Sequence, residues 1–160
     1  MKTYVLMLSR NFPAKHPRKG EQTNFNYQIL NAVWRERNMS IGFPQYGMKL
    51  HTIRGNYELW SKRFEQIEAG KACISLRYWI GKPYHSKQIE IVHLTKEDGI
   101  GIQKLEYNFK ECILHIGNLL LDPEILAIND GLTRKEWEDW FSGYDFTKPL
   151  AIIHFTKFRY

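Results

Sequence analysis

The sequence predicts an α+β fold in which short strands are mixed with three or four short helices. Apolar runs of strand length and segments of helical periodicity follow one another without the regular βαβ order of a parallel sheet. Of the 160 residues, 14% are aromatic and 25% are charged, as is typical of a globular protein. We expect one domain over residues 1–160. A small, partly open barrel with helices at its ends fits these elements.

The first half of the chain predicts one strand, a basic loop and two helices. The apolar run at residues 4–8 predicts the strand, and the basic, proline-containing loop at residues 11–21 fits either a solvated loop or a phosphate-contacting arm. Residues 23–38 predict a helix whose first residue is a capping threonine. A second helix is predicted at residues 57–69, where apolar positions repeat on one face and a glycine follows.

The second half predicts more strands, then two short helices and a last strand. Short apolar runs or alternating patterns predict strands at residues 72–80, 89–94, 100–105 and 112–116. Residues 121–128 fit a helix with a proline in its first turn. Thr133 begins a capping-box sequence, Thr-Arg-Lys-Glu, before the other helix. Residues 150–155 predict the final strand.

The charge balance favours an anionic partner. Lys and Arg number 23 against 17 Asp and Glu, a net charge of +6, which favours nucleic acid without defining a site. No apolar run is long enough to span a bilayer, so we expect no membrane association. The first ten residues resemble the start of a signal peptide, but their apolar core is too short and no small-residue cleavage site follows before Pro13. We therefore expect a cytoplasmic protein.

The cysteines and histidines predict neither a disulfide nor a metal site. Cys73 and Cys112 are the only cysteines, and each lies in an apolar, strand-like segment, which favours buried, reduced thiols. The six histidines are scattered, and no Cys-x-x-Cys or His-x-x-x-His spacing occurs. We expect no metal and no cofactor.

The segment from Gly47 to Arg54 carries the residues best suited to chemistry. Lys49 can act as a general base if burial and a neighbouring cation lower its pKa. Thr52 can act as a nucleophile beside such a base, and Arg54 offers a planar set of donors for phosphate or carbonyl oxygens. The same pattern also fits an ordinary basic strand start with solvated side chains.

The spacing Gly-x-Lys-x-x-x-x-Arg, formed by Gly47, Lys49 and Arg54, resembles the signature of ASCH domains, which are PUA-like folds linked to RNA and nucleobase binding. The internal Lys-x-x-Thr, formed by Lys49 and Thr52, is similar to one branch of that family, small bacterial amidohydrolases acting on N(4)-acetylcytidine. The resemblance implies a PUA-like, partly open barrel with flanking helices and a bound RNA or modified nucleoside. For that branch it also implies removal of the acyl group of an N4-acylated cytosine nucleoside without metal.

Asp130 occupies the place where this branch has a late carboxylate, before a small-residue turn that opens a helix. The branch has glutamate there, and aspartate is shorter by about 1.5 Å; we therefore expect Asp130→Glu to preserve or raise activity. Lys49 would take a proton from Thr52 or from a water held by Asp130, and Asp130 would return it to the leaving amine. Arg54 would hold the pyrimidine oxygen or a phosphate. Asp130-Gly is also a common turn pair.

We expect Lys49, Thr52 and Asp130 to converge on one concave site with Arg54 at its edge. Residues three apart on a regular strand point to opposite faces. The mechanism therefore requires a bend or bulge between Lys49 and Thr52.

A second candidate binding segment runs from Arg77 to Lys87 and interleaves basic and aromatic residues around a turn. Tyr84 is the best placed to stack on a base, and Arg77 and Lys82 are suited to phosphates. An ordinary strand that ends in a basic turn explains the segment equally well.

Three functions compete at this point. The first is an amidohydrolase acting on a modified cytosine nucleoside, and the second is a binding module for RNA or a modified base that catalyses nothing. The third is a phage or mobile-element accessory protein that binds another protein. The Lys49/Thr52 pair favours the enzyme, whereas Asp130 in place of glutamate and the net charge favour binding. The sequence does not indicate an oligomeric state.

Overall fold

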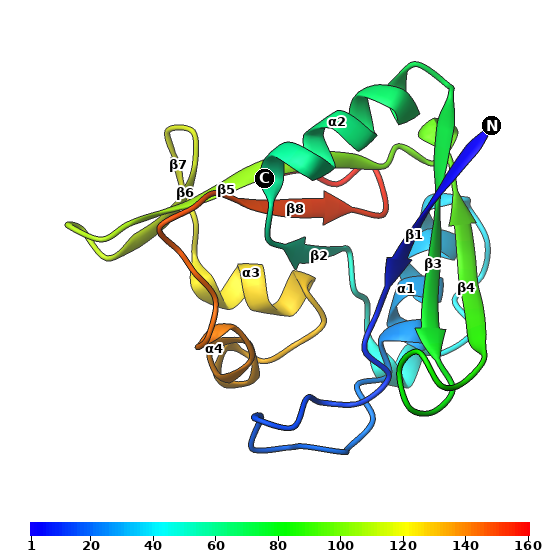
Figure 1. The fold of residues 1–160 in the computed structure, drawn as a ribbon, viewed down its shortest axis with the longest axis horizontal. Helices are drawn as coiled ribbons and strands as arrows, with labels where there is room; N and C mark the ends of the chain where they lie inside the picture. Colours follow the sequence, from blue (N-terminus) through cyan, green and yellow to red (C-terminus); the bar gives the residue numbers. More distant parts are fainter.

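The structure is a computed structural model that describes all 160 residues, and its fold is α+β, as predicted. It contains two separate sheets (Figure 1). In the three-stranded sheet, β1 (Lys2–Met7) runs parallel to the central strand β3 (Ala72–Trp79). β4 (Gln88–Leu94) pairs with the other edge of β3 in the antiparallel direction.

The second sheet has five strands, all paired antiparallel, in the order β2-β8-β5-β6-β7. Its strands are β2 (His51–Arg54), β8 (Leu150–His154), β5 (Gly101–Asn108), β6 (Ile113–Ile116) and β7 (Leu119–Leu120). β8 is buried throughout because it lies between β2 and β5, and it carries the run of apolar residues expected of such a strand.

Four α-helices cover these sheets (Figure 1): α1 (Phe25–Glu36), α2 (Tyr57–Glu68), α3 (Pro123–Asn129) and α4 (Arg134–Phe141). Helix α1 packs against the three-stranded sheet, and α2 contacts strands of both sheets. Helices α3 and α4 pack on each other. Two 3₁₀ helices, η1 (Pro44–Tyr46) and η2 (Lys96–Asp98), complete the regular structure.

Local sequence explains where the two short helices begin. The Asp122 side chain accepts a hydrogen bond from the Glu124 amide, and Pro123 occupies the first helical position of α3. At α4, Thr133 and Glu136 form the capping box that the sequence predicts. The two caps leave only a short junction, in which Gly131 adopts the left-handed region at φ 81°.

A single cluster of 28 buried apolar residues joins the two sheets and the helices. Ile29 of α1, Phe64 of α2, Leu76 of β3 and Ile152 of β8 are among its members, and each is almost completely buried. Such a cluster provides the main stabilising free energy of the fold, because it removes large apolar side chains from water. A membrane-crossing helix would need a longer apolar run than any helix here has.

The structure corrects the predicted partly open barrel. The two sheets do not close into a barrel, because β1 pairs with β3 and forms no ladder with the strands of the second sheet. The short strand β7 was not predicted, since its two residues give no alternating pattern.

Two residue-level predictions also differ from the structure. Cys73 is buried as expected, but Cys112 is exposed with a φ of 55°. Cys112 closes the turn before β6 instead of lying in the strand. Thr23 was predicted to cap α1, but the N-cap position belongs to Asn24, whose side chain makes no capping bond. The Thr23 hydroxyl still accepts a hydrogen bond from the Phe25 amide, the first amide of α1, over 3.3 Å, and it donates to the Ser9 carbonyl over 2.8 Å.

The basic loop at residues 11–21 is folded against α4. Phe12 and His16 are buried, and the Phe12 ring lies 5.6 Å from that of Trp140. Arg18 forms ion pairs with Glu21 and Glu136. The loop is therefore anchored by its aromatic residues and is not fully solvated.

Candidate functional site

The segment that carries Lys49 is held in place by α1. The Gly47 carbonyl accepts a hydrogen bond from Nδ2 of Asn31 over 2.8 Å, and the Lys49 amide donates to the Gln28 carbonyl over 3.2 Å. Gly47 has a φ of 72° and a ψ of −153°, a conformation that glycine adopts readily. Lys49 precedes β2, so the alternation of a regular strand does not apply between Lys49 and Thr52.

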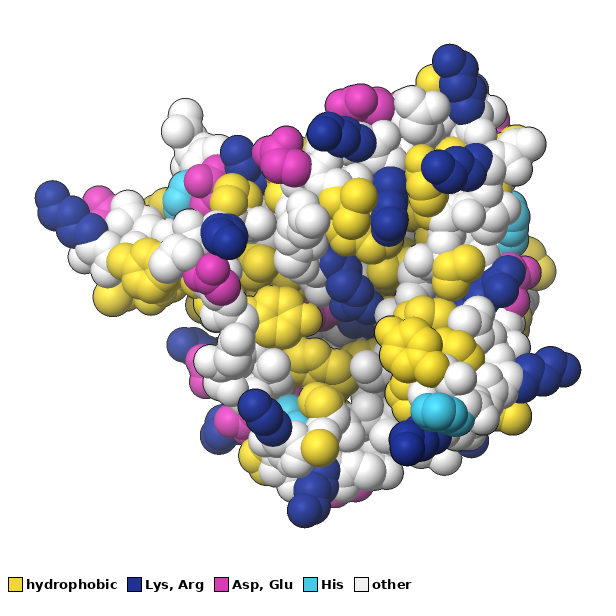
Figure 2. Space-filling view, in the orientation of Figure 1, with side chains coloured by type: hydrophobic (Ala, Val, Ile, Leu, Met, Phe, Trp, Pro, Cys, Tyr) yellow, Lys and Arg dark blue, Asp and Glu magenta, His cyan; other side chains and the backbone are white.

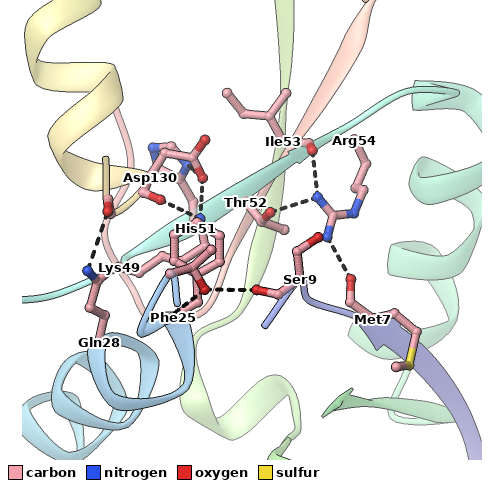
Figure 3. A network of polar contacts seen from close by, with 12 residues as sticks. Met7, Ser9, Phe25, Gln28, Lys49, His51, Thr52, Ile53, Arg54 and Asp130 are labelled. Atoms are coloured by element: carbon pink, nitrogen blue, oxygen red, sulfur yellow. Dashed lines mark hydrogen bonds and ion pairs between the residues drawn. The ribbon is translucent and has the colours of Figure 1, made fainter. Parts of the chain in front are cut away.

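Lys49 and Asp130 form a buried ion pair (Figure 3). Lys49 is 1% exposed and Asp130 is 2% exposed. The Lys49 Nζ donates to Oδ1 of Asp130 at 2.5 Å and to the Asp130 backbone carbonyl. It also lies 4.1 Å from the centre of the Phe25 ring, a cation–π contact. The alternative of a solvated surface lysine is therefore wrong.

Thr52 and Arg54 lie two residues apart on β2 and share one side of the strand. Nη1 of Arg54 donates to Oγ1 of Thr52 over 2.9 Å, and Nη2 donates to the Met7 carbonyl over 2.8 Å (Figure 3). Arg54 forms no salt bridge with a carboxylate, although it lines the same cavity as Asp130. The guanidinium thus bridges the ends of β2 and β1.

These four side chains line one cavity of about 250 Å³. The structure therefore brings together Lys49, Thr52, Arg54 and Asp130, as the sequence analysis expects. The remaining lining residues come from β1 and the segment after it, from α1, and from the α3–α4 region: Met7, Leu8, Ser9, Phe25, Leu132, Trp140, Phe141 and Tyr144. Figure 2 shows the face viewed in Figure 1, on which basic and hydrophobic side chains surround a central hollow.

Burial moves the pKa values of Lys49 and Asp130 toward each other. Burial lowers the pKa of the Lys49 amine, the charge of Asp130 opposes this, and Arg54 adds to the lowering. Burial raises the pKa of the Asp130 carboxyl, whereas Lys49 and Arg54 lower it. The Trp137 indole also acts to lower it, although its Nε1 is outside hydrogen-bond geometry. This pairing makes proton transfer between amine and carboxylate easier than between solvated groups.

The second candidate segment lies apart from this cavity. None of Arg77, Lys82 and Tyr84 lines it, and neither does Gly47. Arg77 donates to Oγ of Ser75 over 2.7 Å at the end of β3.

Tyr84 is 87% exposed in the turn that follows β3, with a φ of 64°, and its ring centre lies 5.5 Å from that of Trp79. The structure therefore gives Tyr84 an open face for stacking but no contact with Lys49.

Sequence reasoning missed the aromatic wall of the cavity. Phe25, Trp140 and Tyr144 line it, beside the buried Arg54, whose pKa burial lowers. The aromatic spacing in α4 signals an apolar face, but only tertiary packing shows that part of this face borders the cavity. The last residue of β1, Met7, and the two residues after it could not be recognised from the sequence, because Met7 contacts Arg54 through its backbone carbonyl, which every residue type has.

A larger cavity of about 480 Å³ lies elsewhere, between the β5–β6 hairpin and α4. It is mainly apolar and contains none of the four converging residues. Size alone favours it as a ligand site. We give more weight to the smaller cavity, because it combines buried titratable side chains of opposite charge with a hydroxyl and a guanidinium.

No group of three or more His, Cys, Asp or Glu side chains is arranged to hold a metal ion. No family model, curated protein or solved structure matches this chain.

Proposed function

We propose that this chain is an ASCH-type, PUA-like domain that binds a modified cytosine nucleoside and hydrolyses its N4-acyl group with Lys49 as the general base. The observation that carries this proposal is the completely buried Lys49–Asp130 pair, which shares a cavity with Thr52 and Arg54. A buried ion pair contributes little net stability, since desolvation offsets its attraction. Its location in a cavity is consistent with a chemical use.

Lys49 has the surroundings that a base requires. Proton transfer near neutral pH is efficient when the pKa of the base is close to the operating pH. Burial and the Arg54 charge both lower the pKa of Lys49 toward that range. Asp130 accepts a hydrogen bond from the amine and can receive its proton, then pass it to the nitrogen that leaves.

Thr52 and Arg54 supply the remaining groups. The Arg54 guanidinium donates to Oγ1 of Thr52 and thereby favours the negatively charged form of that oxygen. In the proposed reaction, water or the Thr52 oxygen attacks the acyl carbon, the carbon–nitrogen bond breaks, and the proton removed by Lys49 reaches the leaving amine through Asp130. Attack by water releases the acyl group as a carboxylic acid. Attack by Thr52 leaves the acyl group as an ester on Oγ1, which a water molecule then hydrolyses to restore the hydroxyl. Arg54 is also the group best placed to hold the pyrimidine oxygen or a phosphate.

The cavity size limits the ligand. Drug-sized ligands occupy cavities of roughly 300–1,000 Å³, and this cavity measures about 250 Å³. We infer that it holds the base and its acyl group while the sugar stays at the mouth. The aromatic side chains of Phe25 and Trp140 provide apolar surface for the flat ring of a base.

The test is the release of cytidine from N(4)-acetylcytidine by the purified chain. Lys49→Ala and Asp130→Asn should each abolish turnover, whereas Lys62→Ala should not, because Lys62 is exposed on α2. Thr52→Ala should be equally damaging if its oxygen is the nucleophile and milder if it positions water. Equal turnover by wild type and Lys49→Ala would contradict the assigned base.

The structure changes the expected effect of Asp130→Glu. Oδ1 of Asp130 already reaches Nζ of Lys49 at 2.5 Å, so the backbone compensates for the shorter side chain. An added methylene in a fully buried site forces neighbours to shift. We now expect Asp130→Glu to lower turnover, not to preserve or raise it.

Binding without catalysis is the second candidate function, and one observation favours it. Both hydrogen bonds of the Lys49 amine go to Asp130, and none goes to Thr52. A site in which Lys49 stays charged would bind RNA or a modified base and turn nothing over. Retained binding of N(4)-acetylcytidine without turnover by the wild type would assign the chain to this class.

A further inference from the structure

Two buried and two half-buried polar side chains lie close together beside Asp130. His51 of β2 and His154 of β8 are fully buried, Asn129 ends α3, and Tyr160 follows β8. None of these four residues lines the cavity, and the proposed hydrolysis gives none of them a role. Buried polar groups without hydrogen-bond partners are uncommon, so their arrangement requires an explanation.

The hydrogen bonds in this group determine which nitrogen of His51 carries the proton. Nδ2 of Asn129 donates to Oη of Tyr160 over 3.1 Å, and the same oxygen lies 2.7 Å from Nε2 of His51. A phenol has one proton, and donating it to Nε2 of His51 gives that proton an acceptor, while the phenol oxygen accepts from Asn129. Nε2 is then the acceptor, so the proton of a neutral His51 is on Nδ1.

The surroundings favour these protonation states near neutral pH. Burial raises the pKa of Tyr160 well above its ordinary value, so its hydroxyl keeps its proton. Burial holds the pKa of His51 well below its ordinary value, and the charges of His154 and Lys49 lower it further. His154 itself packs edge-on against His51 with ring centres 5.5 Å apart and makes no hydrogen bond.

Nδ1 of His51 is buried, has no hydrogen-bond partner and lies 3.9 Å from Oδ1 of Asp130. We propose that His51 is a positioning residue, whose Nδ1–H, fixed by Tyr160 and Asn129, orients the Asp130 carboxylate and favours its charged form. A shift of under about 1 Å brings the two atoms into hydrogen-bond range. Supporting contacts of this kind fix the orientation of a reacting group. The effect of His51 on catalysis depends on the proposed function. The tautomer of His51 and the pKa of the Asp130 carboxyl can be tested without it.

The first experiment reads the tautomer directly. Long-range proton–nitrogen NMR spectra of the whole chain, labelled with ¹⁵N-histidine, report which ring nitrogen of His51 carries the proton. We expect the Nδ1–H tautomer at neutral pH in the wild type. An Nε2–H tautomer or a charged ring would overturn the proposal, whether or not the chain turns over any substrate.

The second experiment compares two amide replacements of His51 by carboxyl NMR titration of Asp130. In His51→Asn the amide nitrogen takes the place of Nδ1, so the donor toward Asp130 is retained; in His51→Gln it takes the place of Nε2, so the donor is lost. Loss of a hydrogen bond to a charged group corresponds to a pKa rise of about 1–2 units. We expect this rise in His51→Gln and a smaller one in His51→Asn, because Lys49, Arg54 and Trp137 act on Asp130 in both variants.

Tyr160→Phe provides a second route if the His51 variants do not fold. It removes the hydroxyl that holds Nε2 as an acceptor, so the Asp130 pKa should rise, while Tyr46→Phe should leave it unchanged because Tyr46 only stacks on Tyr27.

If wild type hydrolyses N(4)-acetylcytidine, His51→Gln should lower kcat about ten-fold and move the acid limb of its pH profile upward. An unchanged Asp130 pKa in both His51→Gln and Tyr160→Phe overturns the proposal. Absence of turnover with a shifted pKa overturns the proposed function alone.

Discussion

At the scale of single residues, the unusual feature is a lysine with almost no contact with solvent. Long charged side chains rarely become fully buried unless they are paired. Lys49 meets this condition through Asp130 and through the face of the Phe25 ring. Asp130 depends equally on Lys49, since its only side-chain hydrogen bond comes from the Lys49 amine.

Lys49→Met should lower the free energy of unfolding by about 3–5 kcal/mol at neutral pH, because it leaves a buried carboxylate without a partner. Lys49 lowers the pKa of Asp130, so the variant raises it further above the unfolded value. A carboxyl with a raised folded pKa binds more protons in the folded state, and its contribution to stability grows as pH falls through that pKa. The deficit should therefore shrink as pH falls from neutral toward about 4.

Urea unfolding of wild type and Lys49→Met across this pH range measures the effect. Lys62→Met is the control, because Lys62 is exposed, and its effect should stay within about 0.5 kcal/mol. The double variant Lys49→Met/Asp130→Leu should recover most of the lost stability, since it removes both charges. If the loss of unfolding free energy in Lys49→Met grew toward acid pH, Asp130 would not be the carboxylate left without a partner.

At the scale of secondary-structure elements, the junction between α3 and α4 sets the site. Asp130 is the C-cap of α3, Gly131 turns the chain, and Thr133 is the N-cap of α4. The Gly131 turn lies against α1, because its carbonyl is 3.4 Å from Nε2 of Gln28. The position of the carboxylate therefore depends on the end of α3, where the Asp130 amide donates to the Leu126 and Ala127 carbonyls, and on the turn that follows.

Gly131→Ala should lower stability by about 1–2 kcal/mol, the cost of a side chain in the left-handed region, and should also lower turnover. An added Cβ would lie 2.1 Å from Oε1 of Gln28 and 3.2 Å from Cβ of Lys49, so Lys49 would be displaced. Gly143→Ala is the matched control, since its φ is not positive and nothing lies within 4 Å of its Cβ position. Thermal unfolding and the cytidine-release assay measure both effects. Equal stability and equal turnover of Gly131→Ala and Gly143→Ala would show that the α3–α4 junction does not position the site.

At the scale of the whole molecule, the cavity forms where the two sheets meet the helices. The end of β1 supplies the Met7 carbonyl, β2 supplies Thr52 and Arg54, and the α3–α4 region supplies Asp130 and the aromatic wall (Figures 1 and 3). The molecule as a whole carries a net charge of +6. The exposed Tyr84 lies in the basic turn between β3 and β4.

Single-stranded RNA should bind less tightly as salt concentration rises, because binding releases counterions from the phosphates. Tyr84→Ala should weaken binding by about 1–3 kcal/mol through the loss of one stacked base. Phe109→Ala is the control: Phe109 is also exposed, at 57%, but lies in the β5–β6 turn. Fluorescence anisotropy over a salt series measures both effects. RNA affinity that does not change with salt concentration would indicate that the partner is not a nucleic acid. An equal loss of affinity in Phe109→Ala would contradict a specific role of Tyr84.

The sequence by itself predicted the α+β class, most helices and strands, and the capping of α4. These features depend on interactions within a few residues, which leave a periodic or capping pattern in the chain. The proximity of Thr52 and Arg54 was predictable for the same reason, because the two residues share one face of a single strand.

Only the tertiary structure determined the rest. The family resemblance led us to expect Lys49 and Asp130 in one site, but only the structure shows that these residues, 81 positions apart, form a buried ion pair. The contact of His51 with Tyr160, which spans 109 positions, was not expected at all. No local pattern encodes such contacts, since they arise when the whole core packs and removes the side chains from water. The same reason explains the separate sheets in place of a barrel: strand partners are chosen by long-range packing, which the alternation within one strand does not specify.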